Sequence, residues 1–259
     1  MLAARLLAVL VALTWLIFPG FGLIDLGVSW DADWPVVLEA GWGAFMTVLL
    51  GGSFLAVAVR PTRAAPATLT LVAALAALLV SAVVGFEWQL VGYAALLGLE
   101  TLVVLLLVPG RERVRPLRRA ISPSLLVLAV VGAVPLLVAA ARMFRLNRGD
   151  AGEGIGELTM GVDHHAVQGA LALAVAALAF VAAVWPRGRR LVGASAGLTA
   201  AYVGLVSFAF PGAWAGFSPT WSALGAVWGA ATAGLSLAAP RPLQPRELGG
   251  EVVEAERAL

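Results

Sequence analysis

The sequence predicts an all-α membrane protein: a polytopic helix bundle with about eight transmembrane helices arranged as four hairpins. Hydrophobic residues make up 61% of its 259 residues and charged residues 12%, whereas soluble domains contain about half and about a quarter. Apolar stretches of about 20 residues, the length that crosses a bilayer, recur along the chain. Alternation with a period of two is absent, and open strands cannot satisfy their backbone in lipid. The apolar stretches are therefore predicted to be helices.

Proline, glycine or serine marks most breaks between the apolar stretches. The predicted spans, in order, cover residues 3–24, 36–59, 67–86, 89–108, 121–141, 164–185, 191–211 and 219–239. Ser122 and Ser218 each precede a proline, which is typical of an N-cap followed by the first helical residue. The first stretch resembles a signal peptide, but it is long for one and lacks a cleavage site of small residues, so we interpret it as a retained span. We expect residues 240–259 to form a mobile cytoplasmic tail.

The basic residues predict the orientation. All 17 are arginine. If the N-terminus lies inside, the outer connections contain only Arg142, Arg145 and Arg148, and every other arginine falls on the inner side. Positive residues concentrate on the cytoplasmic side of membrane proteins, so we expect a protein integral to the cell membrane with both termini in the cytoplasm.

The residue inventory excludes several kinds of chemistry. The chain has no cysteine, which removes disulfides, thiolate metal sites and a cysteine nucleophile. It also has no lysine, which removes Schiff-base chemistry. Its two histidines are neighbours, whereas haem held between helices needs histidines on separate spans. We therefore expect no cofactor and no metal, and the inner arginines, which face anionic lipid, give no reason to expect nucleic acid as a partner.

Helices that enter from the outer side begin alike. Trp88, His165 and Trp221 each stand four residues before a glycine. A ring at the interface anchors a helix, and a small residue one turn deeper lets a neighbour approach. An ancestral hairpin repeat would give a pseudo-symmetric bundle, as in many transporters; the alternative is only a shared way of starting a membrane helix. Trp42 and Trp228 lie deeper, where they either line a pocket or pack.

Two carboxyl groups fall inside predicted spans. An ionisable group in the bilayer interior costs about 3 kcal/mol on insertion scales, so it is a functional candidate. Glu100 lies near the middle of its span, and Gln89, Tyr93 and Leu97 share its helix face. It would act as a proton carrier, a cation ligand or an acid catalyst, or else bond to a neighbour such as Tyr202 or Thr199. Glu39 lies about one turn inside its helix, where the positive helix end favours a carboxylate.

The densest polar region is the long outer connection from Arg142 to Gln168. Arg142 and Arg145 either bind a lipid phosphate or another anionic group through forked hydrogen bonds, or pair with nearby carboxylates. His164 and Gln168 lie one turn apart on one helix face, where they would bind a ligand together. Asp163 either caps that helix or joins His164 and a loop carboxylate around zinc.

These features favour a transporter or permease-like protein. Its outward-facing site, Arg142, Arg145, Asp163, His164 and Gln168, would recognise a polar or anionic group above a helix seam containing Glu100. One alternative is an intramembrane enzyme acting on a lipid or isoprenoid, with Glu100 or Glu39 as general acid. Another is a membrane scaffold or assembly subunit. We expect membrane lipids, a small polar or anionic ligand, and either a membrane-protein partner or a second copy of the chain as partners.

Overall fold

The structure, a computed structural model, describes residues 1–108, 121–149 and 164–239, and all regular structure in these ranges is helical. Six of the described helices are long and apolar enough to cross a membrane, which agrees with a multipass membrane protein. They are Val36–Val59, α5 (Ala65–Gly85), α6 (Gln89–Leu106), α7 (Pro123–Arg148), α9 (His164–Val184) and α10 (Arg189–Ala209). The predicted count of eight spans in four hairpins is not confirmed.

The predicted first span, 3–24, is not one helix. It forms α1 (Leu2–Leu16) and a short second helix, α2 (Gly22–Val28). Pro19 cannot donate a backbone hydrogen bond, and a Cβ on Gly20 would lie 2.6 Å from the backbone of Trp15. The chain therefore turns back on α1 here, and Phe21 takes a left-handed conformation with φ of 53° before α2 begins.

The helix Val36–Val59 has three parts, namely α3 (Val36–Ala44), a π-helical segment η1 (Phe45–Gly51) and α4 (Gly52–Val59). A short 3₁₀ turn, η2 (Pro61–Arg63), leads from it into α5. A π segment widens the helix locally and is frequent at functional sites. In this chain it follows directly after the turn that carries Glu39 and Trp42.

Two helix ends differ from the sequence prediction. The helix α7 runs to Arg148 instead of ending at 141, because no glycine or proline follows Pro135 before Gly149. The predicted last span forms α11 (Pro219–Ala238), but it is not among the six because its serines, threonines and glycines lower the mean hydropathy. Ser122 and Ser218 occupy N-cap positions with proline at the helix start, as expected, although neither side chain makes a capping hydrogen bond.

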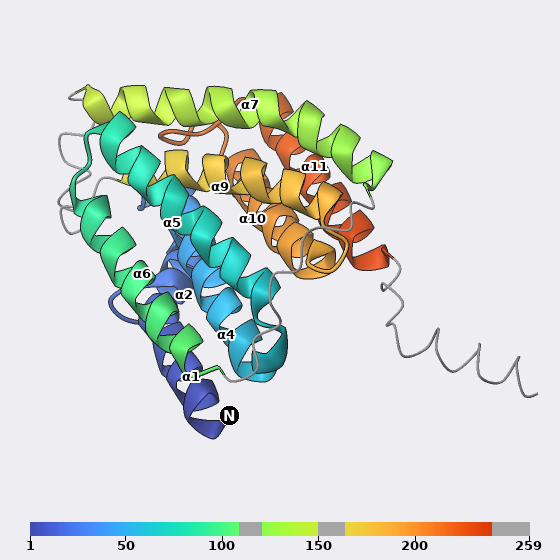
Figure 1. The fold of residues 1–259 in the computed structure, drawn as a ribbon. Coiled ribbons are helices and arrows are strands. Elements are labelled where there is room, and N and C mark those ends of the chain that lie inside the picture. The colour runs from blue at the N-terminus through green and yellow to red at the C-terminus, as the bar shows by residue number, and fades with distance from the viewer. Residues whose placement is uncertain (109–120, 150–163, 240–259) are drawn as a thin grey trace, which may run out of the picture.

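The helix α9 is the centre of the bundle. It packs against α3, α5, α7 and α10, and 72% of its apolar window is buried, compared with 22% for α7. Figure 1 shows α7 stretched along one side of the molecule next to α9, with α1 and α6 at the opposite side. Side chains at the start of α9 therefore lie inside the protein.

Candidate functional site

A buried ion pair joins the start of α9 to the first turn of α3. Glu39 on α3 is only 2% exposed and His164, the first residue of α9, only 6%. The His164 Nδ1 atom lies 3.5 Å from the Glu39 Oε1 atom, which is long for a hydrogen bond, and it has no hydrogen-bond partner among the described residues. The pair therefore retains an unmet hydrogen-bonding capacity in the protein interior.

Asp25 on α2 completes a three-residue cluster, which we call the acid–histidine cluster (Asp25, Glu39 and His164). The Asp25 carboxyl forms a side-chain hydrogen bond with that of Glu39. Burial raises the pKa of Asp25 from 3.8 to about 8, and the charge and hydrogen bond of Glu39 act in the same direction. At neutral pH, Asp25 is therefore mainly protonated.

Aromatic rings enclose one side of the acid–histidine cluster. The Trp42 ring stacks on the His164 ring, with centroids 4.3 Å apart and an angle of 20° between the planes. Its indole N–H donates a 2.8 Å hydrogen bond to the Gly20 carbonyl, which ties α3 to the break between α1 and α2. Tyr93 of α6 meets the Trp42 ring edge to face at 5.5 Å. These contacts hold the His164 ring in a fixed orientation.

The start of α9 is held from outside its own helix. The Asn147 side-chain oxygen on α7 accepts a 2.8 Å hydrogen bond from the Ala166 N–H, and its amide nitrogen donates to the Gly85 carbonyl at 3.2 Å. One of the N–H groups that a helix start leaves unpaired is thereby satisfied by a neighbouring helix. Asn147 therefore positions His164 by fixing the turn that carries it.

Gln168 faces α3 one helical turn beyond His164. It is 4% exposed, and its side-chain oxygen lies where a Cβ on Gly41 would be. This oxygen has no hydrogen-bond partner among the described residues. The structure thus brings His164, Gln168 and Glu39 together at one α3–α9 contact, which sequence spacing alone did not show for Glu39.

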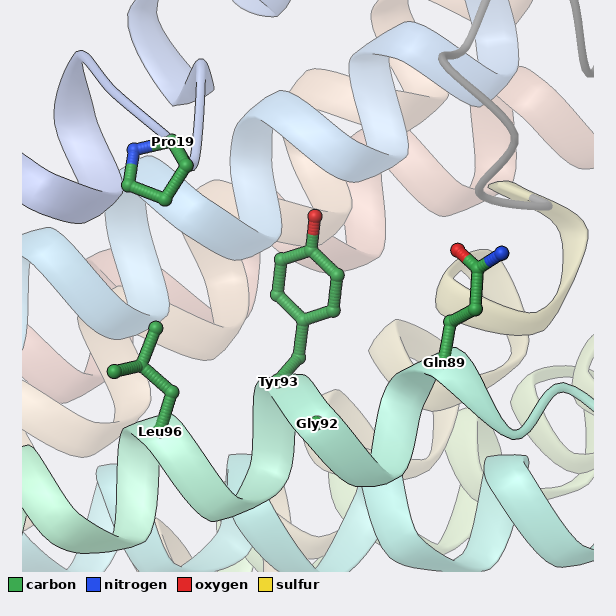
Figure 2. A pocket seen from close by; sticks show the side chains of 5 residues that line it. All are labelled: Pro19, Gln89, Gly92, Tyr93 and Leu96. Carbon is green, nitrogen blue, oxygen red and sulfur yellow. The ribbon is translucent and has the colours of Figure 1, made fainter.

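A cavity of about 200 Å³, open to the surface, lies next to α6, and none of the three cluster residues lines it. It is lined by Pro19, Gln89, Gly92, Tyr93 and Leu96. Figure 2 shows the Tyr93 ring projecting from α6 between Pro19 and Gln89, with its hydroxyl directed away from α6. Asp25 interacts electrostatically with that hydroxyl. Tyr93 therefore lines the cavity and also contacts the Trp42 ring that stacks on His164.

Glu100 lies apart from the cluster. It is half-buried on α6, and its two oxygens accept hydrogen bonds from the Trp15 indole at 2.7 Å and the Thr14 hydroxyl at 3.2 Å, both on α1. The expected alternative partners, Tyr202 and Thr199, were wrong: Tyr202 bonds to Leu26, Ser29 and Trp30 instead. Thr199 has no hydrogen-bond partner among the described residues.

Among the described residues, the predicted arginines make no contact with the acid–histidine cluster or with Gln168. Arg142 is half-buried and donates a 2.8 Å hydrogen bond to the Gly216 carbonyl, with its guanidinium over the Phe217 ring. Arg145 is exposed. Asp163 lies outside the described residues. Of the five residues predicted to bind a ligand, the structure therefore unites only His164 and Gln168.

The second histidine points elsewhere. The His165 Nε2 atom accepts a 3.0 Å hydrogen bond from the Trp214 indole, so adjacent histidines on α9 face different neighbours, as helical geometry requires. Within the described ranges, no group of three histidine, aspartate or glutamate side chains is arranged to hold a metal ion.

Sequence reasoning missed two members of this arrangement. Asp25 falls between the predicted spans 3–24 and 36–59, because the pattern of apolar residues does not predict the break after α1, and Asn147 lies beyond the predicted end of its span at 141. The Pro19-Gly20 pair was the available signal for the break. Comparisons with protein-family models, curated proteins and solved structures found no match to this chain. Function must therefore follow from the chemistry of the site.

Proposed function

We propose that the protein is a transporter or permease-like carrier in which the acid–histidine cluster binds and releases a proton. The observation that supports this most directly is the contact between Glu39, Asp25 and His164 inside a bundle of apolar helices. Ionisable groups buried in membrane bundles are costly and usually mark ion or proton pathways. Tyr93, which contacts the Trp42 ring beside the cluster, also lines a cavity, and this cavity would give a solute a place to bind.

One carboxyl of the cluster titrates near neutrality. Burial and the neighbouring Glu39 raise the pKa of Asp25 to about 8. Interacting groups of this kind take up protons as a unit. A solute entering the cavity would change the proton affinity of the cluster through Tyr93, which lines the cavity and interacts with Asp25.

The proposed carrier has eight spans, with the N- and C-termini in the cytoplasm. Two observations support counting α1 and α11 as spans: α1 packs along α4 and η1, and α11 packs closely against α10. The arginine distribution supports the orientation. In this arrangement Asp25 lies outside the spans on the short helix α2, and Glu39, His164 and Tyr93 lie near the outer ends of their spans, which makes the site outward-facing.

Arg142 and Arg145 have a different proposed role. Arg142 is already bonded to a carbonyl, and an anionic solute would be repelled by the carboxyls of the cluster. We propose that these two arginines contact lipid phosphates at the outer surface. A membrane-protein partner or a second copy of the chain stays a prediction.

An intramembrane enzyme is the second candidate. Pro19, Gly92 and Leu96 give the cavity a mainly apolar lining, and two carboxyl groups lie behind Tyr93, so a lipid-like substrate with Asp25 or Glu39 as general acid fits the same geometry. The enzyme candidate predicts that a lipid is chemically converted without any flux of solute across the membrane.

Proteoliposomes loaded with a pH-sensitive dye test the carrier proposal. Choline, glycine betaine, acetate, phosphate and glycerol would be added in turn, and the internal pH recorded for wild type, Glu39→Gln and a control at an exposed carboxyl, Asp33→Asn. We expect at least one solute to drive proton movement in wild type and in Asp33→Asn, and none in Glu39→Gln. The same response in wild type and Glu39→Gln for every solute, whether large or absent, would reject the proposal.

A further inference from the structure

The α10–α11 loop (residues 210–218) packs over the ends of the two helices that form the buried site. Its Trp214 indole N–H donates a 3.0 Å hydrogen bond to the His165 Nε2 atom on α9, and the two rings meet edge to face. Ala215 is 6% exposed and belongs to the same buried apolar cluster as Leu38 on α3. The loop therefore contacts both α3 and α9.

A third helix, α7, holds the end of the same loop. The Arg142 guanidinium donates a 2.8 Å hydrogen bond to the Gly216 carbonyl and lies over the Phe217 ring, 5.9 Å from its centroid. The Phe217 N–H donates a 3.0 Å hydrogen bond to the Ser207 hydroxyl on α10. Because α7 and α9 pack side by side (Figure 1), one short loop reaches both. The loop is thus attached through separate side-chain contacts and not through regular structure.

These contacts directly adjoin the buried ion pair. Leu38 precedes Glu39 in α3, and His165 follows His164 in α9. The loop therefore packs on the same helical turns that carry the pair. Glu39 is 2% exposed and His164 6%, so the pair does not exchange protons or solutes with the outer water in this conformation. Exchange with that side requires a covering segment to move.

The loop backbone favours such a movement. Ala215 has a left-handed conformation with φ of 58°, and Gly212 has φ of 85°. Glycine adopts positive φ without strain, whereas in alanine the Cβ is crowded against the following carbonyl. Strain of this kind persists only where the surrounding structure holds it, and Ala215 is held by the apolar cluster with Leu38. Release of the loop would relieve this strain, which offsets part of the cost of opening.

We propose that the α10–α11 loop is a lid, which closes the outer entrance to the buried ion pair and opens when Trp214 leaves His165. For its purpose the lid rests on the proposed carrier, because a carrier site must be reached from the outer side. Opening itself requires only that the loop separates from α3 and α9 while the helices stay folded. The Trp214 ring is already 48% exposed, and the membrane interface, which favours indoles, would receive it.

A permanent cap is the alternative to a lid. If the loop only completed the fold, loss of its contacts would lower the stability of the whole protein and expose all buried positions alike. A lid exposes only the positions that it covers, since local opening leaves the rest of the fold intact. The two alternatives therefore differ in which buried residues become accessible.

Thiol labelling of the purified full chain in detergent distinguishes the lid from the cap. The chain has no cysteine, so one introduced thiol reports one position. Leu38→Cys lies under the loop, and Ala215→Cys on its inner face is a second reporter. Leu90→Cys is the matched control, because Leu38 and Leu90 are both fully buried near the starts of their helices. A water-soluble methanethiosulfonate reagent should label each thiol at a rate that follows its open population.

Two variants weaken the loop contacts, and each has a control that changes an exposed residue of the same type. They are Trp214→Phe with Trp221→Phe, and Arg142→Leu with Arg145→Leu. We expect Trp214→Phe and Arg142→Leu to speed the labelling of Leu38→Cys about fivefold, the effect of one lost hydrogen bond, and to leave Leu90→Cys unchanged. Both controls should leave both rates unchanged. Equal acceleration at the two cysteines, or none at Leu38→Cys and Ala215→Cys, would overturn the lid.

Joining the loop to α9 tests whether its opening serves transport. In the double variant His165→Cys/Trp214→Cys, a short, cleavable bifunctional thiol reagent links the two positions. Proton movement in the proteoliposome assay should stop when they are linked and return when the link is cleaved. Unchanged proton movement with the loop linked would overturn the lid and leave the carrier. Local opening detected by labelling, without proton movement for any solute in wild type, would support the lid and remove the carrier.

Discussion

At the scale of single residues, the clearest division is between two buried carboxyl groups with different surroundings. Glu100 accepts hydrogen bonds from Trp15 and Thr14 on one neighbouring helix. Glu39 instead adjoins a second carboxyl and a histidine that lacks a hydrogen bond. A carboxyl whose oxygens both accept hydrogen bonds holds two helices together. A carboxyl that is incompletely paired can instead exchange a proton. The residue that the sequence favoured more strongly, Glu100, is therefore the weaker functional candidate.

The first prediction concerns the hydrogen bonds that join Glu100 to α1. Trp15→Phe removes the indole donor from Glu100, and we expect it to destabilise the protein by about 1 to 3 kcal/mol. Glu100→Gln should cost less, because its amide oxygen still accepts the indole N–H. Thermal unfolding in detergent measures both, with Trp88→Phe, at an exposed position, as control. A melting temperature of Trp15→Phe equal to that of the control would contradict the role.

The second prediction concerns the pH dependence of stability. The folded pKa of Asp25, about 8, is above its ordinary value of 3.8, so the folded protein retains a proton that the unfolded chain has lost. Stability from this group is therefore greatest below about pH 4, falls as the pH rises, and levels off above about pH 8. Unfolding midpoints recorded across this range should vary less in Asp25→Asn. An equal slope in both proteins would show that Asp25 titrates normally.

At the scale of helices, small residues decide which pairs approach closely. On α10 and α11, Gly197 and Gly229 face each other's backbone, and a Cβ on Gly229 would collide with the backbone of Ala201. Small residues give membrane helices close backbone contact when no water is present to drive association. This explains why α10 and α11 form the tightest hairpin although α11 is not among the most apolar helices.

The third prediction uses two glycines of α11. Gly229→Ala should destabilise the protein by about 1 to 3 kcal/mol through overpacking. Gly225→Ala is the matched control, because nothing lies within 4 Å of its added Cβ, and it should be neutral or stabilise the helix by up to about 1 kcal/mol. Unfolding with increasing dodecyl sulfate compares them. Equal midpoints for the two variants would reject the close α10–α11 contact.

At the scale of the whole molecule, the position of the site follows from the most buried helix. The helix α9 is surrounded by four others, so its first turn lies inside the protein although it follows a long connection. The same arrangement leaves α7 at the periphery, where valines such as Val127, Val131, Val134 and Val138 are exposed. We expect acyl chains to cover this face.

The fourth prediction concerns orientation. The chain has no cysteine, so each introduced cysteine is the only thiol. In intact cells an impermeant maleimide should label Trp88→Cys and leave Thr62→Cys and Leu2→Cys unlabelled until the membrane is opened. Labelling of Leu2→Cys in intact cells, with Thr62→Cys still protected, would show that α1 does not cross. Labelling of Thr62→Cys in intact cells would show that the protein has the opposite orientation.

The sequence by itself determined the class of this protein and most of its helix positions. Runs of about 20 apolar residues and the prolines and serines between them are local properties, and local properties define where a membrane helix begins and ends. It also identified Glu39, His164 and Gln168 as candidates, because polar residues in apolar stretches are conspicuous.

Only the tertiary structure decided which candidates meet. Asp25 reaches Glu39 because the chain breaks at Pro19-Gly20 and α2 packs on α3, and His164 reaches Glu39 because α9 is central. Arg142 and Arg145, near His164 in sequence, contact neither His164 nor Glu39 among the described residues. Contacts between helices depend on which faces pack together, and in a chain that is apolar on every side the hydrophobic pattern does not specify those faces.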